Sequence, residues 1–234
     1  MVNSRCIYWH IEWLTDLGKL VLKMINSSQF AGAKMPIFQS IFGVPWCELP
    51  LVMQKHYAIR PFSRDRVVVR GKMTIKRSLM VRLMAPLLNI LEILVSYDGK
   101  DIPTQVTFYS VPESPDFHFD RKLTPSDLTA IHFHSRVIQC DGNEVVELMK
   151  FGLGWRARYQ IKGEQVTLTH IGYVWGIGDM MLSLPLTWLL GKVSAVEDVL
   201  TDSSFKMWMA ISHPIFGEHY RYEGTFDIAE VIYE

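Results

Sequence analysis

The feature that most constrains the fold is a series of glycine turns between short runs of β-forming residues. Asp98-Gly99, Asp141-Gly142 and Lys162-Gly163 each stand between two such runs. A dipeptide of this kind is a strong local signal for a β-hairpin, because glycine reaches the positive φ that a tight turn needs. About ten candidate strands can be counted, most of them joined by short turns. Consecutive strands with hairpin links predict an antiparallel meander rather than a βαβ fold.

Alternation within one of these runs predicts which side chains face inward. Trp155, Ala157 and Tyr159 alternate with Arg156 and Arg158. Successive side chains of a strand point to opposite faces of the sheet. The run is therefore predicted to be a strand with one dry, largely aromatic face and one wet, basic face.

The stretch HPIFGEHYRYEGTFDI, residues 213–228, is predicted to be a hairpin of the same kind. It begins with a proline turn in which Gly217 is free to take a positive φ. For His213, at the start of this turn, a hydrogen bond to the local backbone is expected rather than a role as general base. The return strand places three aromatic side chains on one face, Tyr220, Tyr222 and Phe226.

Helical patterns lie before and between the strands. Apolar residues recur at helical spacing over residues 5–26, which predicts an amphipathic helix, and residues 27–45 then resemble a connector. A second helical stretch is predicted over residues 79–91, with a break at Pro86. Gly176–Leu200 contains the apolar sequence MMLSLPLTWLLG, too long for a hairpin loop. We expect it to form a short helix that lies over the sheet or across its open end.

These patterns predict two parts. Residues 1–48 form an N-terminal amphipathic helix and connector, and residues 49–234 form an antiparallel β domain. The fold class is α+β and mainly antiparallel β. We expect a curved sheet or barrel, calycin-like or helix-grip-like, with N-terminal helices and a helical crossing segment near residues 178–200.

Composition and charge exclude several functions. The 24 Lys and Arg residues balance 24 Asp and Glu residues. This balance argues against nucleic-acid binding, which requires an excess of clustered basic residues. Charged residues interrupt the apolar N-terminal segment, and no segment reaches the roughly 18–20 apolar residues of a membrane span. Cys6, Cys47 and Cys140 form no CxxC pair, which argues against a zinc knuckle and indicates free thiols. We therefore expect a soluble, cytoplasmic protein.

Five short motifs are dispersed between about Leu49 and Ile228. They are LPLVMQKHY at 49–57, VVVRGKM at 67–73, FHFDRKL at 117–123, VVELMKFG at 145–152 and HPIFGEHYRYEGTF at 213–226. With these motifs the chain resembles a bacterial family known as domain of unknown function 4166. The resemblance implies neither an agreed activity nor established catalytic residues, and the segment before Leu49 lies outside it.

Two histidines are the residues closest to a metal-binding pattern. His132 and His134 stand on one side of a predicted strand, roughly 6.6 Å apart at strand rise, a spacing that can serve a metal ion. His118 and Asp120 lie on the preceding strand. A zinc or cupin-like site still needs a third well-placed ligand, and the next carboxylate, Asp141, lies in a turn. The sequence therefore predicts no metal and no other cofactor, and these three histidines are the candidates should a metal bind.

Glu147 is a single carboxylate in an otherwise apolar strand, on the same side as Val145 and Met149. An unpaired charge in a core costs several kcal/mol, so an inward carboxylate needs a partner. Arg156 or Arg158 on the next strand is the predicted partner. A structural ion pair is favoured over a ligand anchor, but if Glu147 faces a cavity, a polar head group would dock there.

Aromatic and sulfur-containing side chains are more numerous than one-sided strands require. The chain has 7 Trp, 9 Tyr, 12 Phe and 12 Met residues. Curved antiparallel sheets of this size often hold one small apolar ligand, and Met suits an adaptable cavity. We therefore expect a cavity of several hundred Å³ that binds a hydrophobic small molecule or lipid. The candidate ligand-binding residues are Glu147, Trp155, Arg156, Arg158, Tyr159, Trp175, Trp188, Tyr220, Tyr222 and Phe226.

Two other functions are weighed against this one. The first is a module without a cavity that contacts a partner or a membrane surface through residues 5–26, which would place the protein at the periphery of a membrane. The second is an enzyme acting on a small apolar substrate, whose histidines would converge on a carboxylate inside the cavity. The residue pattern favours a non-enzymatic role.

Overall fold

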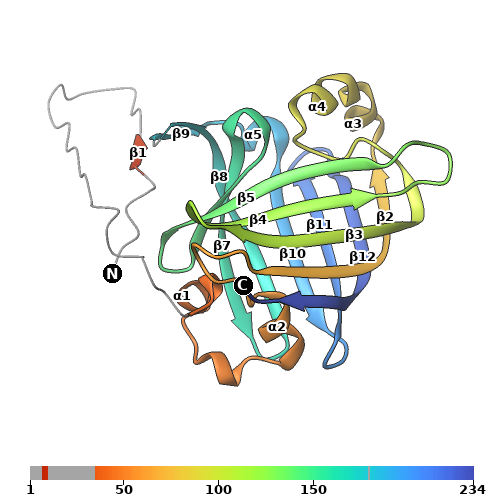
Figure 1. The fold of residues 1–234 in the computed structure, drawn as a ribbon. Coiled ribbons are helices and arrows are strands. Elements are labelled where there is room, and N and C mark those ends of the chain that lie inside the picture. The colour runs from red at the N-terminus through yellow and green to blue at the C-terminus, as the bar shows by residue number, and fades with distance from the viewer. Residues whose placement is uncertain (1–6, 10–34, 179) are drawn as a thin grey trace, which may run out of the picture.

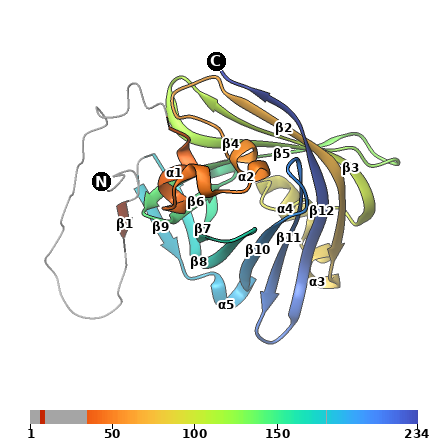
Figure 2. The same ribbon diagram turned by 90° about the horizontal axis from the view of Figure 1, so that it is seen from below.

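A computed structural model describes residues 7–9, 35–178 and 180–234 of the chain. Figures 1 and 2 together label the helices and strands. In chain order the elements are β1 (Ile7–Trp9), α1 (Ile37–Phe42), a 3₁₀ turn (Trp46–Glu48), α2 (Leu51–His56), β2 (Arg66–Arg77), α3 (Leu79–Leu83), α4 (Ala85–Leu91), β3 (Gly99–Val111), β4 (Ser114–Leu123), β5 (Ile131–Asp141), β6 (Glu144–Leu148), a second 3₁₀ turn (Lys150–Gly152), β7 (Leu153–Lys162), β8 (Gln165–Ile177), β9 (Met180–Leu184), α5 (Thr187–Leu190), β10 (Lys192–Val199), β11 (Ser204–His213) and β12 (Gly217–Ile232).

The sheet closes into an antiparallel barrel. Within the described residues the sheet has twelve strands, and all except β1 and β9 belong to the closed ring. From β2 to β8 each strand pairs with the next, β8 pairs with β10, and β10, β11 and β12 lead back to β2. The predicted fold class, α+β with mainly antiparallel strands, is confirmed, and the curved sheet is a barrel that closes completely.

Three of the four predicted hairpins are present, and one of them is the β11–β12 hairpin, in which Gly217 adopts a φ of 67°. Gly142 and Gly163 follow β5 and β7 and adopt φ values of 51° and 58°, as the tight turns require. The hairpin predicted at Asp98-Gly99 is wrong, because helices α3 and α4 are inserted between β2 and β3. The Asp98 carboxylate instead accepts hydrogen bonds from the Arg77 guanidinium at 2.9 and 3.1 Å. Aspartate here serves as the partner of an arginine rather than as a turn residue.

The helical stretch over residues 79–91 is divided earlier than predicted. The Ser78 side chain caps α3 by accepting from the Val81 N–H, and the break falls at Met84. Pro86 lies in the first turn of α4, where its missing N–H has no helical partner to lose.

Helices α1 and α2 close one end of the barrel, opposite the end that carries α3 and α4 (Figures 1 and 2). The Phe38 ring of α1 lies 4.3 Å from the Tyr57 ring and 4.9 Å from the Phe117 ring, and all three side chains are buried. This corrects the connector prediction for residues 37–42, since α1 supplies apolar side chains to the same core as the β domain, while residues 27–34 lie outside the described residues.

The N-terminal helix predicted over residues 5–26 lies mostly outside the described residues. Residues 7–9 form strand β1, which pairs in parallel with β9 instead of continuing a helix. Among the described residues, no helix has the length and apolar character needed to cross a membrane.

The predicted helical crossing near residues 178–200 is mostly extended chain. β9 pairs with the last part of β8, and only Thr187–Leu190 form a helical turn, α5, before β10 begins. Pairing with β8 supplies hydrogen-bond partners for the backbone of β9. The apolar run predicted to be helical is therefore a short strand. The turn α5 packs on β11 at the rim of the barrel.

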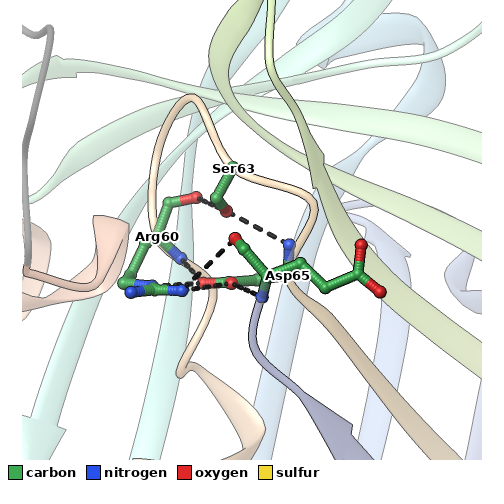
Figure 3. Close-up of polar contacts among 4 residues, drawn as sticks. Arg60, Ser63 and Asp65 are labelled. Carbon is green, nitrogen blue, oxygen red and sulfur yellow. Dashed lines mark hydrogen bonds and ion pairs between the residues drawn. The ribbon is translucent and has the colours of Figure 1, made fainter.

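Asp65 ties the loop before β2 to the C-terminal end of the chain (Figure 3). Its carboxylate accepts from Arg60 Nε and Nη2, each at 2.7 Å, from the Arg60 N–H at 3.0 Å and from the Glu234 N–H at 3.1 Å. The Ser63 hydroxyl, which donates to the Arg60 carbonyl, accepts from the Asp65 N–H. This cluster, centred on the buried Asp65 side chain, fixes the loop against the end of β12, the strand whose pairing with β2 closes the barrel.

The prediction of free thiols is wrong for Cys140, which is disulfide-bonded, and correct for the exposed Cys47. Spacing along a chain does not report which thiols meet in the folded protein.

Candidate functional site

Two cavities occupy the interior of the barrel. Each has a volume of about 70 Å³. One lies toward the α4 end and is lined by Ile93–Val95, and the other lies toward the α2 end and is lined by His56. The predicted volume of several hundred Å³ is too large, because Met and aromatic side chains from the strands fill much of the space. Six residues line both cavities, so that side chains alone separate them: Met73, Arg121, Glu147, Trp155, Met209 and Tyr222.

A largely buried ion pair, Arg121–Glu147, stands in this shared wall. Arg121 Nη2 donates to Glu147 Oε1 at 3.0 Å, across the strands β4 and β6. The Ser135 hydroxyl accepts from Arg121 Nη1 at 2.8 Å and donates to Glu147 Oε1 at 2.6 Å, and Trp155 Nε1 donates to Glu147 Oε2 at 3.0 Å. The Arg121 guanidinium also lies over the Phe119 ring, 4.5 Å from its centre. The side chains of the pair are each 15% exposed, and both line the cavities.

The electrostatics of this cluster favour the charged forms. Burial raises the pKa of Glu147, but the Arg121 charge and the hydrogen bonds from Ser135 and Trp155 outweigh burial and lower that pKa. Burial lowers the pKa of Arg121, and the nearby Glu147 carboxylate reverses that effect and raises it. Burial also raises the pKa of Tyr222, in the same wall, to about 12. The interior therefore holds an ionised, mutually neutral pair among neutral phenols.

A second polar cluster lies at the α2 end. The Tyr57 hydroxyl donates to Glu197 Oε2 at 2.6 Å, and His56 Nε2 lies 3.6 Å from the same oxygen. The Nδ1 atom of His56 is buried and has no hydrogen-bond partner among the described residues. His56 and Glu197 both line the second cavity, so this cavity presents polar atoms at its far end as well as at the Arg121–Glu147 pair.

The structure brings one group of the predicted ligand-binding residues together around the cavities. Tyr220 lines the first cavity, Tyr159 and Phe226 line the second, and the remaining members line both. The predicted dry faces of β7 and β12 are the interior faces of the barrel. This group is Glu147, Trp155, Tyr159, Tyr220, Tyr222 and Phe226.

The other predicted residues lie outside the cavities. Arg156 and Arg158 both pair with Glu144, so the prediction that one of them neutralises Glu147 is wrong. Strand alternation explains the error, since Glu144 and Glu147 are three positions apart and point to opposite faces. Trp175 is 41% exposed and donates to the Phe151 carbonyl, and Trp188 on α5 is 71% exposed at the barrel rim.

The histidines expected to converge inside the cavity of an enzyme lie elsewhere. His132 and His134 are exposed on the outer face of β5 and approach Asp120 rather than an interior carboxylate. The His118 ring stacks on Tyr109 with its centre 5.0 Å away. His213 bonds its local backbone as predicted, accepting from the Ile215 N–H at 3.1 Å.

Sequence reasoning missed Arg121, Ser135, His56 and Glu197. Arg121 had a detectable signal, because in FHFDRKL it shares the alternation of Phe117, Phe119 and Leu123, which places a basic residue on an apolar face. The others gave no such signal, since they become neighbours only through barrel closure and the packing of α2.

Comparison with known proteins identifies a family for this chain. A family model described as "Domain of unknown function (DUF4166)" matches residues 49–226. No curated protein matches the chain. Among solved structures, the crystal structure of Rv2717c from M. tuberculosis is similar with 10% sequence identity and a TM-score of 0.38, over 72% of this chain and 92% of that one. Because the family model spans most of the barrel and contains every strand from β2 to β11, the chain belongs to the DUF4166 family.

Proposed function

We propose that the barrel binds a small molecule with an apolar body and one polar group, and that the polar group docks at the Arg121–Glu147 pair. The observation that carries this proposal is the position of the pair, in the wall that both cavities share. A buried ion pair seldom stabilises a protein more than apolar residues of the same size would. The position of the pair beside two cavities is therefore better explained by binding of a ligand's polar group than by a contribution to the stability of the fold.

The hydrogen-bonding capacity of the pair indicates the class of polar group. A guanidinium has five N–H donors, and Arg121 donates one bond from Nη1 to Ser135 and one from Nη2 to Glu147. Glu147 already accepts three hydrogen bonds. The cluster thus has donors to spare and no net charge, so a neutral acceptor such as an ester or ketone oxygen fits better than a carboxylate, which would leave a buried net charge.

The apolar body of the ligand would occupy the cavities on either side of the pair. A volume of about 70 Å³ holds only a few heavy atoms, so a larger ligand needs side chains to move. Met73 and Met209 stand in the shared wall, and an unbranched thioether side chain changes rotamer readily. Displacing either side chain would enlarge the space beside the pair.

Native mass spectrometry and thermal unfolding of the full chain test this proposal. We expect medium-chain alkyl esters or ketones to bind and raise the melting temperature, and fatty acids and alkanes of equal length to bind more weakly. Met209→Phe fills the shared wall and should weaken ester binding at least about tenfold, the effect of losing about 1.4 kcal/mol. Met180→Phe is the matched control, since Met180 is 49% exposed on β9, outside the cavities. Equal binding by the two variants, or no binding of any neutral probe, would refute the proposal.

A second candidate function is docking on a lipid surface. Large apolar side chains are exposed at the end of the barrel that carries α3, α5 and the β11–β12 turn. The turn and α5 are joined by the 2.7 Å hydrogen bond between His213 Nε2 and the Trp188 carbonyl, and α3 packs on β2 and β12 beside them. An exposed apolar group of this kind is typical of an interaction surface. The side chains are Leu79, Leu83, Trp188, Ile215 and Phe216.

Vesicle flotation tests this second function. Phe216→Ser should reduce the fraction of protein that floats with zwitterionic vesicles. Leu200→Ser, at the β10–β11 turn on the opposite end of the barrel, should leave it unchanged. Equal flotation of the two variants would exclude this end as the docking surface. Contact through residues 5–26, which are largely outside the described structure, stays a separate prediction.

A further inference from the structure

A carboxylate and two imidazoles converge on the outer face of the barrel, on the side of the sheet away from the cavities. On β4, Asp120 stands between Phe119 and Arg121, which point inward, so its side chain points outward. On β5, His132 and His134 flank the inward Phe133 and share that outer face. Asp120 is directly opposite His134 in the antiparallel register.

The spacing of the three side chains suits a metal ion better than hydrogen bonds. Asp120 Oδ1 lies 3.5 Å from His132 Nδ1 and 3.4 Å from His134 Nδ1. These distances are longer than the usual limit of about 3.2 Å for an N–H···O hydrogen bond. Ligands at about 2.0–2.1 Å from a tetrahedral zinc ion are about 3.3–3.4 Å apart, which agrees with both separations. One ligand atom from each residue lies within 4.8 Å of those of the other two.

The Asp120 oxygen between the imidazoles lacks a hydrogen-bond partner among the described residues. Asp120 Oδ1 is buried and forms no hydrogen bond with any described residue. A buried, unsatisfied carboxylate oxygen carries a desolvation cost that a cation would remove. The two imidazole rings are nearly parallel, with an interplanar angle of 20°, and both present Nδ1 to this oxygen.

The surroundings allow an ion to enter and keep water. The His132 and His134 side chains are 47% and 57% exposed, so the site opens to solvent. Lys122 lies opposite His132 across the strand pair, and it is exposed, so water and salt screen its charge. Three protein ligands with a remaining open position form the type of site that zinc and related ions occupy.

We propose that Asp120 Oδ1, His132 Nδ1 and His134 Nδ1 bind a divalent transition-metal ion, with zinc as the first candidate and water at the open position. This inference is independent of ligand binding in the barrel, because none of the three residues lines a cavity in the interior. It supplies the third ligand that sequence spacing did not reveal, since Asp120 precedes His132 by twelve positions and reaches it only through the β4–β5 pairing.

Isothermal titration of the full chain with zinc chloride, in a buffer free of chelators, tests the site. We expect one zinc ion per chain. His134→Ala and Asp120→Asn should each weaken binding at least about tenfold. His118→Ala is the matched control on the outer face of β4, and Cys47→Ser controls for the exposed thiol. Both controls should bind zinc as the unmodified chain does.

The location of the ion is tested separately by ¹⁵N NMR of the imidazoles. One equivalent of zinc should shift the Nδ1 signals of two histidines, and His134→Ala should abolish the shift of both. Thermal unfolding in a chelator checks that the substituted surface leaves the fold intact. The proposal is overturned if the unmodified chain binds no zinc, if His134→Ala binds it equally well, or if His118→Ala weakens binding as much as His134→Ala.

Discussion

Removing the charge of Glu147 is the sharpest test of the interior cluster. Glu147→Gln keeps the shape of the side chain but leaves the Arg121 guanidinium without a counter-charge. Breaking a buried ion pair by removing one partner costs about 3–5 kcal/mol. Because both side chains are 15% exposed and line cavities, we expect the lower end of this range, about 3 kcal/mol. For a chain of this size that loss lowers the melting temperature by about 6–12 °C.

Urea denaturation followed by circular dichroism measures this loss. Glu218→Gln is the control, since Glu218 pairs with Arg221 at the surface and is 43% exposed. An exposed pair contributes below about 1 kcal/mol. In an Arg121→Met background the sign should reverse, because Glu147 is then the unpaired charge and Glu147→Gln relieves it. The reasoning fails if Glu147→Gln costs no more than Glu218→Gln, or if it costs the same with and without Arg121.

Two further predictions concern stability. Burial raises the pKa of Asp65, but the Arg60 guanidinium and the Arg60 and Glu234 N–H groups outweigh burial and lower it. The stabilisation is therefore complete above the unfolded pKa of about 3.9 and is lost as pH falls through the folded pKa. Because Arg60 is 33% exposed, Asp65→Asn should cost about 3 kcal/mol at pH 7, the lower end of the range for breaking a buried ion pair. It should also flatten the dependence of the urea midpoint on pH between about 5 and 3, and an unchanged dependence would refute this. Gly152→Ala, whose Cβ would lie 2.1 Å from the Gly176 carbonyl oxygen, should destabilise far more than Gly142→Ala, which has a similar positive φ but nothing within 4 Å, so equal losses would show that φ alone matters.

Local patterns in the sequence predict much of the barrel. Alternation over Trp155–Ile161 and Tyr220–Phe226 identifies interior faces correctly, because side-chain period along a strand is a property of the backbone itself. Glycine turns at Gly142 and Gly163 are equally local, since they depend only on φ. The dispersed motifs, from Leu49 onward, indicate the DUF4166 family, which the family model confirms.

Patterns that depend on neighbours in space were predicted less well. The apolar run of β9 was predicted to be helical because a short stretch of sequence does not show which strand pairs with it. Its partner is the end of β8. Residues 37–42 were predicted to be part of a connector because their sequence does not show what they pack against. Their apolar side chains become buried only at the end of the closed barrel. The volume left inside also depends on how side chains from facing strands interdigitate.

The sequence by itself determined most of the strands, most of their turns and many of the residues that face inward, because each of these follows from backbone geometry over a few positions. Only the tertiary structure decided which charges meet. Arg121 and Glu147 are separated by 26 positions, and Asp120 and His134 by 14, and both encounters arise from strand pairing around the barrel. Electrostatic and coordination contacts act over a few ångströms in space, so the sites they form exist only once the sheet has paired and closed.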